Sequence, residues 1–288
     1  MGMIIAIISG KGGVGKTTAT ANIGLGIALN NRRCVVVDFD IGQRNLDMIL
    51  GLENRVVYDM IQVMDNEASL RQALIKSKVS DNLYFLAASQ TKDKSALESS
   101  KIKQLIENLS NEFEYVILDA PAGIESGYEH TIEFADSAIV VVNPEVSSIR
   151  DSDRAIGILD SKSQKVKDGF DVDKYLIINR IIPEMVESGE MLSSDDILEI
   201  LNIKLLGKVA EDKSVIDASN QGIPIILNSK SIAGSAYQRI ADRLCGDNVP
   251  IEEPKIQNRG FVGKLKGMFS WYFLGIKKKR VQILQEIG

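Results

Sequence analysis

Short apolar runs alternate with longer amphipathic stretches along this chain of 288 residues. The runs are rich in Val and Ile and do not alternate with polar residues, which is typical of parallel strands covered on both faces. We predict strands at residues 4–8, 34–37, 83–87, 115–118, 138–142, 176–178 and 205–209. Helix-length stretches, among them residues 18–30, 96–109, 148–161 and 232–245, lie between the strands. This order predicts an α/β fold with a doubly wound, mostly parallel sheet, which binds ligands at the carboxyl ends of its strands.

A glycine-rich loop follows the first predicted strand and opens the first predicted helix. It reads GKGGVGKTT over residues 10–18 and matches the phosphate-loop pattern G-x-x-x-x-G-K-[ST] in the strand–loop–helix context that the pattern requires. The glycines let backbone N–H groups surround an anion, and the helix N-terminus adds a partial positive charge. A glycine turn that binds nothing is the alternative. The expected nucleotide-binding residues are Gly10, Lys11, Gly12, Gly13, Val14, Gly15, Lys16, Thr17 and Thr18.

Three side chains of this loop have separate expected roles. Lys16 should reach the outer phosphates, and the hydroxyl of Thr17 should ligate Mg²⁺. Lys11 is a second lysine that an ordinary phosphate loop does not need. We expect it to project from the outer side of the loop, where it can reach phosphates held by a second subunit. A solvated surface charge is the alternative for Lys11.

Carboxylates follow two other predicted strands at the same edge of the sheet. Asp119 comes directly after the run at 115–118, and a carboxylate beside the phosphate loop can hold Mg²⁺ through water. A turn-forming aspartate is the alternative. Asp38 and Asp40 follow the second strand, and one of them can orient the attacking water, since phosphoryl transfer needs mainly positioning and charge compensation.

Several longer stretches resemble the MinD/ParA family of ATPases, whose phosphate loop is a deviant Walker A motif. The resemblance is carried by GKGGVGKTT, DFDIG-x-RNLD, DxPAGIE and NPEVSSIRDSDR, points to the MinD branch that places the division septum, and runs across roughly residues 3–270. Two positions depart from the family pattern, because Ala120 replaces the usual serine and Ala210 the usual proline. Neither departure removes a charged catalytic group.

The resemblance implies roles for individual residues. Lys11 would cross a dimer interface, Asp40 would position the attacking water, and Asp38 and Asp40 would form a nucleotide-sensing switch. Asn179, after the strand at 176–178, would contact adenine, unless it is a turn or cap residue. The candidate catalytic residues are therefore Lys11, Lys16 and Asp40, and the candidate metal ligands are Thr17 and Asp119.

The same resemblance implies cofactors and partners. It implies ATP and Mg²⁺, an ATP-dependent homodimer, MinC as the recruited division inhibitor and MinE as the stimulator of hydrolysis. The expected contact surface lies near Arg44, Asn45 and residues 151–154.

Composition narrows the class of protein further. Hydrophobic residues make up 44% of the chain and charged residues 25%, as in an ordinary globular protein. Cys34 and Cys245 show no spacing that suggests a disulfide scaffold or a metal site, and His130 is the single histidine. The sequence shows no signal-peptide pattern and no run of 18 apolar residues, so we expect a cytoplasmic protein.

The net charge of −5 is unevenly distributed. Residues 255–288 carry eight basic side chains and one acidic one, a net +7, so the rest of the chain carries −12. Such asymmetry indicates that the basic segment meets an anionic surface. We expect a P-loop ATPase domain at 1–249, a linker at 250–258 and a separate tail at 259–288.

The tail has the pattern of an amphipathic helix that lies in a membrane interface. Its apolar side includes Phe261, Val262, Leu265, Met268, Phe269, Trp271, Tyr272 and Phe273. A helix packed on the body is the alternative. One tail should bind weakly, whereas two tails on a dimer gain by roughly 10²–10⁴ through effective concentration. The expected location is therefore peripheral, on the inner face of the cell membrane.

Together these features predict an ATP-driven dimerisation switch whose output is membrane residence. The alternatives are a flagellar-number ATPase or a ParA-type DNA-segregation ATPase of the same family, an iron–sulfur carrier, and a scaffold that binds nucleotide without hydrolysing it. The cysteine pattern counts against the carrier, and the carboxylates at 40 and 119 count against the scaffold. The aromatic face of the tail suits lipid better than DNA.

Overall fold

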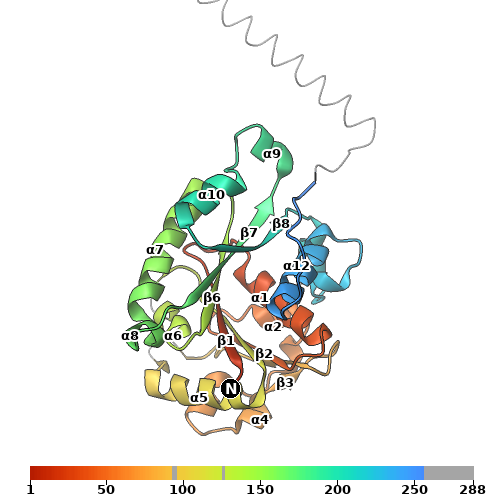
Figure 1. Ribbon diagram of the computed structural model, residues 1–288. Coiled ribbons are helices and arrows are strands. Elements are labelled where there is room, and N and C mark those ends of the chain that lie inside the picture. Colours follow the sequence, from red (N-terminus) through yellow and green to blue (C-terminus); the bar gives the residue numbers. More distant parts are fainter. Residues whose placement is uncertain (93–95, 125–126, 256–288) are drawn as a thin grey trace, which may run out of the picture. The chain divides into compact units, whose positions relative to one another are not determined.

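A computed structural model describes residues 1–92, 96–124 and 127–255 of the chain (Figure 1). The predicted membrane-binding tail lies outside these residues. One compact unit extends from Met1 to Pro254. Within it, eight strands form a single sheet in the order β3-β4-β2-β5-β1-β6-β7-β8.

All seven predicted strands are present, and each pairs in parallel with its neighbours among these seven. They are β1 (Met3–Ile8), β2 (Cys34–Asp38), β4 (Leu83–Leu86), β5 (Tyr115–Asp119), β6 (Ser137–Val142), β7 (Asp173–Ile181) and β8 (Lys204–Ala210). The eighth strand, β3 (Ile75–Lys76), pairs antiparallel with β4 at one edge of the sheet. Two residues are too short to give an apolar run, so the sequence pattern did not reveal it.

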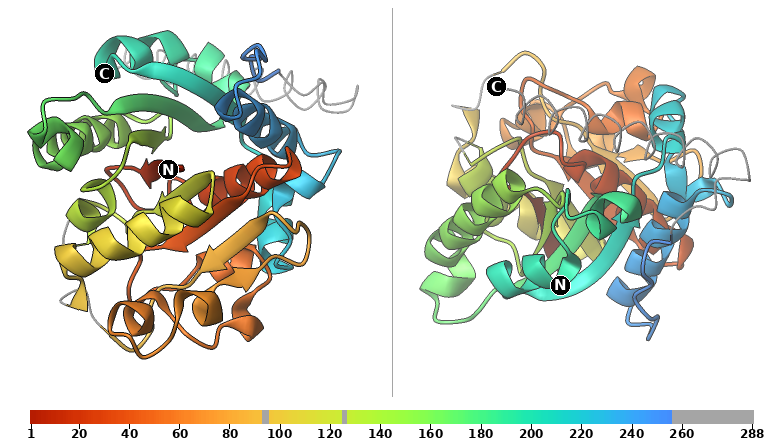
Figure 2. Two further views of the ribbon diagram at one scale, coloured as in Figure 1. Left: turned by 60° about the horizontal axis from the view of Figure 1, so that its bottom comes forward. Right: turned by 90° about the horizontal axis from the view of Figure 1, so that it is seen from above.

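Helices cover both faces of the sheet, which confirms the doubly wound fold. One face packs against α1 (Lys16–Leu29), α2 (Leu46–Ile49), η3 (Ile225–Leu227) and α12 (Ile232–Leu244). The other face packs against α3 (Met60–Met64), α5 (Ser99–Glu112), α6 (Tyr128–Ile132), α7 (Val146–Lys162) and α10 (Ser194–Leu201). Figures 1 and 2 show α7 and α12 on opposite sides of the strands. Shorter helices, η1 (Glu53–Arg55), α4 (Leu70–Ala73), α8 (Gln164–Lys167), α9 (Pro183–Glu187) and α11 (Ser214–Asn220), complete the described elements.

The central strand β1 shows why the apolar runs do not alternate. Ile5 and Ile7 lie in the cluster under α1 and α12, while Ala6 and Ile8 lie in the cluster under α6 and α7. All four side chains are fully buried. Both faces of the strand are therefore core, as the sequence pattern predicts.

Two glycines bring α1 close to its neighbours. A Cβ atom on Gly24 would lie 2.4 Å from Cγ1 of Val36 in β2, and one on Gly26 would lie 2.5 Å from Cβ of Ala241 in α12. Real Cβ atoms do not approach other atoms this closely. The helix that follows the phosphate loop is therefore seated directly on both the sheet and α12.

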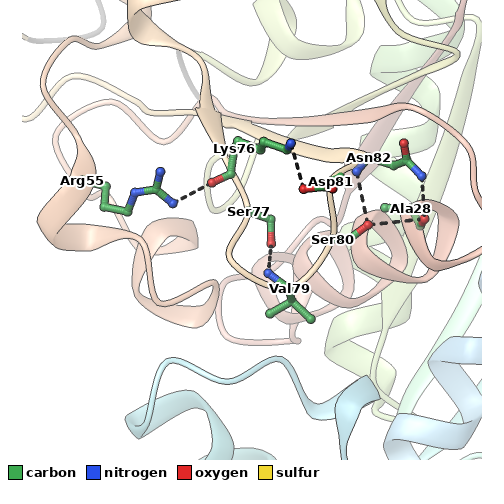
Figure 3. A network of polar contacts seen from close by, with 8 residues as sticks. All are labelled: Ala28, Arg55, Lys76, Ser77, Val79, Ser80, Asp81 and Asn82. Atoms are coloured by element: carbon green, nitrogen blue, oxygen red, sulfur yellow. Dashed lines mark hydrogen bonds and ion pairs between the residues drawn. The ribbon is translucent and has the colours of Figure 1, made fainter.

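The far end of α1 meets the loop between β3 and β4 (Figure 3). The Ser80 hydroxyl and the Asn82 side-chain amide both contact the Ala28 carbonyl oxygen at 3.5 Å. At the start of this loop, Lys76 of β3 pairs with Asp81 at 2.8 Å. These contacts give polar partners to the carbonyl end of α1, where helix carbonyls lack bonds within the helix.

The last described residues lie against α12 and β8. The Arg243 guanidinium donates to the carbonyl oxygens of Leu206 at 2.8 Å and Val249 at 2.7 Å. Arg239 pairs with Glu252 at 3.3 Å, and Lys208 pairs with Glu253. The first residues of the predicted linker are thus held by ion pairs. Within the described ranges, no helix has the length and apolar content to cross a membrane.

Candidate nucleotide site

The glycine-rich loop joins β1 to α1, as predicted. Gly13 and Gly15 have positive φ angles of 78° and 101°, a conformation that favours glycine. Gly15 is also the N-cap residue of α1, and no side chain caps that helix end. The free N–H groups at the start of α1 and the partial positive charge of the helix end are therefore available to an anion.

Close packing constrains the loop from two sides. A Cβ atom on Gly10 would lie 2.0 Å from the backbone of Asp151 in α7, and the Gly10 N–H donates to the Ser152 hydroxyl at 3.3 Å. A Cβ atom on Gly15 would lie 2.4 Å from Nδ2 of Asn179 in β7. The loop is thus held between α7 and the end of β7.

Lys16 lies behind the loop, and its side chain is buried. Its ammonium donates to the Ser9 hydroxyl at 2.9 Å. Burial lowers the pKa of Lys16, while the charges of Asp119 and Asp40 raise it. The pKa is lowered on balance, so the ammonium ion lacks full compensation from its neighbours. A phosphate anion would supply the missing negative charge.

Lys11 lies on the outer side of the loop, as the sequence suggests. Its Nζ atom lies 3.2 Å from Oε2 of Glu145 and donates to the Ser147 hydroxyl at 3.1 Å. Glu145 is the N-cap residue of α7, and Ser147 is in its first turn. The Lys11 and Glu145 side chains are 43% and 49% exposed, so the contact is easily exchanged for another partner.

The predicted carboxylates meet beside Lys16. Asp38 and Asp119 are partners in the register of β2 and β5, and both are buried at the carboxyl end of the sheet. The Asp40 N–H donates to Asp38 at 2.9 Å, and the Asp40 charge acts on both Lys16 and Asp119. Burial raises the pKa of Asp38 well above its usual value, and the nearby Asp119 charge raises it further.

Asp119 has two hydroxyl partners and the charge of Lys16 nearby. Thr20 donates to Asp119 Oδ1 at 2.8 Å, and Thr17 also hydrogen-bonds to this carboxylate. Burial raises the pKa of Asp119 to about 6, against the lowering effects of Thr20, Thr17 and Lys16. The two predicted metal ligands, Thr17 and Asp119, are thus brought together by the fold.

Asn179 lies at a cavity on the other side of the loop. Its side-chain amide donates to the Val14 carbonyl oxygen at 2.7 Å. The cavity is lined by Gly15, Thr18, Asn179, Arg180, Val209, Ala210, Glu211, Asp212, Val215, Ile216, Ala233 and Tyr237. Its lining is mixed, with apolar side chains such as Val209 and Tyr237 beside polar ones such as Thr18 and Asp212, and it adjoins the phosphate loop at Gly15.

Most of the predicted partner-contact residues are exposed, although Ser152, within residues 151–154, is fully buried. Asn45, Asp151 and Arg154 are exposed. Arg44 is less accessible, because it forms an ion pair with the buried Asp47. The side chains of Asn45, Asp151 and Arg154 are thus accessible to a partner.

Several residues at the site were not singled out by sequence reasoning. Ser9 contacts Lys16, and Thr20 contacts Asp119. Glu145 and Ser147 both contact Lys11. Serine, threonine and glutamate occur throughout the chain, and the partners of Lys11 lie more than 130 positions away. Sequence signals existed for Ser9, which directly precedes the glycine loop, and for Glu145 and Ser147, which lie in the family stretch NPEVSSIRDSDR, but neither signal indicated a contact with a lysine.

Comparisons with known proteins agree with this geometry. The family model described as an AAA domain matches residues 2–172. The chain is 53% identical over 270 residues to the septum site-determining protein MinD of Helicobacter pylori, which covers 94% of this chain and all of that protein. Among solved structures, a MinC:MinD cell division protein complex from Aquifex aeolicus is similar with a TM-score of 0.77 and 41% identity, over 87% of this chain and 98% of that one.

A third similar protein is MinD from Pyrococcus horikoshii, solved with Mg-ADP. Its TM-score is 0.73 at 26% identity, over 86% of this chain and all of that one. These matches favour the MinD branch over the flagellar-number and DNA-segregation alternatives. The fold, the two-lysine phosphate loop and the identity over nearly the whole length agree, and the chain belongs to the MinD family of septum site-determining cell-division ATPases.

Proposed function

We propose that this protein binds Mg²⁺–ATP at residues 10–18 and dimerises across the bound nucleotides. The dimer associates with the membrane through its tails and leaves the membrane after hydrolysis. The observation that carries this proposal is the pair of lysines on one loop, with Lys16 buried behind it and Lys11 at its outer side. One lysine serves the nucleotide of its own subunit, and the other is free to exchange its partner for a second subunit.

The residues present fit a magnesium ion. Thr17 and Asp119 supply a hydroxyl and a carboxylate side by side, and such hard oxygen ligands suit Mg²⁺. Among the described residues, no cluster of three or more His, Cys, Asp or Glu side chains could hold a metal alone. This agrees with Mg²⁺ in phosphate-loop sites, which takes few protein ligands and completes its shell with phosphates and water. Bound there, Mg²⁺ would neutralise charge on the outer phosphates.

The protein's own groups account for the remaining steps of hydrolysis. The loop N–H groups and Lys16 would hold the β- and γ-phosphates, and Asp40 would orient the attacking water from the end of β2. Asn179 would contact adenine in the cavity next to Gly15. Asp38, buried and tied to the Asp40 N–H, would transmit a change at Asp40 to the segment that follows β2.

Dimerisation requires Lys11 to leave Glu145 and Ser147. This exposed ion pair contributes about 0–1 kcal/mol, so its loss opposes dimerisation only weakly. In the dimer, Lys11 would meet the phosphates of the partner's nucleotide. The paired tails would then bind an anionic membrane through Phe261, Leu265, Phe269 and their apolar neighbours.

The proposed role in the cell is septum placement from the inner face of the cell membrane. The complex solved for the Aquifex aeolicus relative supports MinC as a partner. MinE as the stimulator of hydrolysis follows from the family resemblance. The proposed contact surface includes Arg44, Asn45 and the exposed residues near Asp151 and Arg154.

Sedimentation with vesicles tests the switch. Full-length protein is mixed with anionic lipid vesicles and ADP, ATP or a non-hydrolysable ATP analogue. We expect ATP and the analogue to bring the protein down with the vesicles and ADP to leave most of it in solution. Equal sedimentation in all three nucleotides would refute a nucleotide-driven membrane switch, and retention on DNA in place of vesicles would favour a DNA-segregation role.

The variant Lys11→Ala tests the shared site. We expect it to remain folded, because Lys11 makes only exposed contacts, and to lose ATP-dependent dimerisation and vesicle binding. Lys103→Ala is the matched control, since Lys103 is also exposed and pairs only loosely with Glu107, at 4.0 Å. Light scattering gives the dimer fraction, and a Lys11→Ala protein that dimerises like the control would contradict the role.

A further inference from the structure

Ser9 lies between β1 and the glycine loop, and its side chain is completely buried. Its hydroxyl donates to the Lys11 carbonyl oxygen at 2.7 Å. The Ser9 hydroxyl oxygen also accepts a hydrogen bond from the Lys16 ammonium at 2.9 Å. A hydroxyl has one proton and two lone pairs, so both bonds form together and run in one direction, from Lys16 through Ser9 to Lys11.

We propose that Ser9 is a positioning residue for phosphoryl transfer, because it fixes both the Lys16 ammonium and the Lys11–Gly12 peptide in the arrangement that receives phosphates. The inference rests on the proposed nucleotide function and adds a residue to it. Ser9 does not itself touch the reacting atoms.

The first step concerns Lys16. Its flexible side chain is attracted by the charges of Asp119 and Asp40. A direct ion pair with either carboxylate would draw the ammonium away from the loop. Ser9 offers a neutral acceptor on the loop side, anchored at the end of the central strand. Because an ammonium has three N–H donors, Lys16 can keep its bond to Ser9 and still donate to a phosphate.

The second step concerns the loop backbone. In a trans peptide, the carbonyl and the following N–H point in opposite directions. The described residues contain no cis peptide bond. When the Lys11 carbonyl is bound to Ser9, the N–H of Gly12 therefore points away from Ser9. Gly12 is exposed, and in the proposed arrangement this N–H is directed at the entering phosphate.

The variant Ser9→Ala removes one hydroxyl and both of its bonds. A hydrogen bond to a charged group is worth enough to change affinity by about 10-fold or more. We expect the dissociation constant for ADP to rise about 10-fold and kcat for ATP hydrolysis with anionic vesicles to fall by a similar factor. Both change because Lys16 serves the bound nucleotide and the transition state alike.

A matched control separates positioning from general stability. Ser152 is also fully buried, and its hydroxyl also contacts the loop, at the Gly10 N–H. It does not contact Lys16. We expect Ser152→Ala to change ADP affinity by less than about 3-fold, although both variants leave a buried loop group without its hydroxyl partner.

The possible outcomes separate a failure of the role of Ser9 from a failure of the proposed nucleotide function. Ser9→Ala with wild-type ADP affinity and kcat would overturn the role of Ser9 alone. So would equal losses in Ser9→Ala and Ser152→Ala, or a fall in the Tm of the nucleotide-free protein with unchanged kcat per folded molecule. Failure of the wild-type protein to bind ADP or hydrolyse ATP would instead overturn the proposed function.

Discussion

The carboxylate of Asp212 joins three segments beside the base cavity. One oxygen accepts hydrogen bonds from the Ser214 N–H at 2.9 Å and the Ser214 hydroxyl at 2.6 Å. The other accepts from the Ser231 hydroxyl at 2.6 Å and the Ala233 N–H at 3.3 Å. Burial raises the pKa of Asp212, but these hydrogen bonds lower it more, so the pKa lies below its usual value. This residue therefore holds the starts of α11 and α12 in place.

Replacement of Asp212 tests this contribution. We expect Asp212→Asn to lower the free energy of unfolding by about 1–3 kcal/mol at pH 7, since hydrogen bonds to a charged group are lost. Asp212 has a lowered pKa in the folded state, so its contribution is present above its unfolded pKa and is lost as the pH falls through the folded value. The difference between wild type and variant should therefore shrink below about pH 4.

Urea unfolding at several pH values measures this difference. Asp217→Asn, at an exposed position in α11, is the control and should change stability by less than about 0.5 kcal/mol. A wild-type advantage that stays constant down to pH 3 would show that the Asp212 charge is not the cause.

At the scale of elements, helix α7 packs against the phosphate loop. Its N-terminus supplies the partners of Lys11, and its next turn supplies the backbone against which Gly10 packs. Gly10 has no positive φ angle, so glycine is required there by close approach and not by backbone conformation. The position of the loop therefore depends on the position of this helix.

The pair Gly10→Ala and Gly12→Ala tests this packing. A methyl group on Gly10 would overlap the Asp151 backbone, whereas one on Gly12 would only touch Cβ of Ala122 at 3.4 Å. We expect Gly10→Ala to destabilise the fold by about 1–3 kcal/mol and to weaken ADP binding, as overpacking does. Gly12→Ala should keep wild-type stability within about 0.5 kcal/mol. Equal thermal midpoints for the two variants would contradict close packing of Gly10 against α7.

At the scale of the whole molecule, the apolar side chains on the two faces of the sheet are organised differently. Its α1 and α12 face is a continuous apolar cluster, while its other face is divided between one cluster under α3 and α5 and one under α6, α7 and α10. The site lies at the carboxyl ends of the central strands, where residues from β1, β2, β5 and β7 meet. The acidic remainder of the chain and the basic segment at 255–288 have opposite net charges.

The proposed membrane tail gives a whole-molecule prediction. Leu265→Glu places a charge on the predicted apolar face, and Ser270→Glu makes the same charge change on the polar face. Burial of a large apolar side chain contributes about 1.5–3 kcal/mol, so Leu265→Glu should reduce ATP-dependent vesicle binding at least about 10-fold. Ser270→Glu should have a much smaller effect. ADP binding in solution should be unchanged in both, and similar vesicle binding by the two variants would argue against an amphipathic helix in the membrane.

The fold was largely predictable because buried parallel strands leave a clear apolar signal. Strands β1 to β8 were all found except β3, and α1, α5, α7 and α12 appeared within a few residues of their expected ends. Helices of four or five residues, such as α2 and α4, were not predicted, since they are too short to show helical periodicity. Helix α7 begins two residues before its predicted start. These two residues include Ser147, which contacts Lys11.

The sequence by itself determined the phosphate loop, the carboxylates at strand ends and the basic aromatic tail, because each depends on neighbouring residues or on a local period. Only the tertiary structure decided what these groups contact. It placed Ser9 between Lys11 and Lys16, Glu145 against Lys11, and Asn179 against Val14. The contacts of Lys11 with Glu145 and of Asn179 with Val14 join residues that are far apart in the chain. Common polar side chains, including the nearby Ser9, acquire such roles only when the fold brings them together.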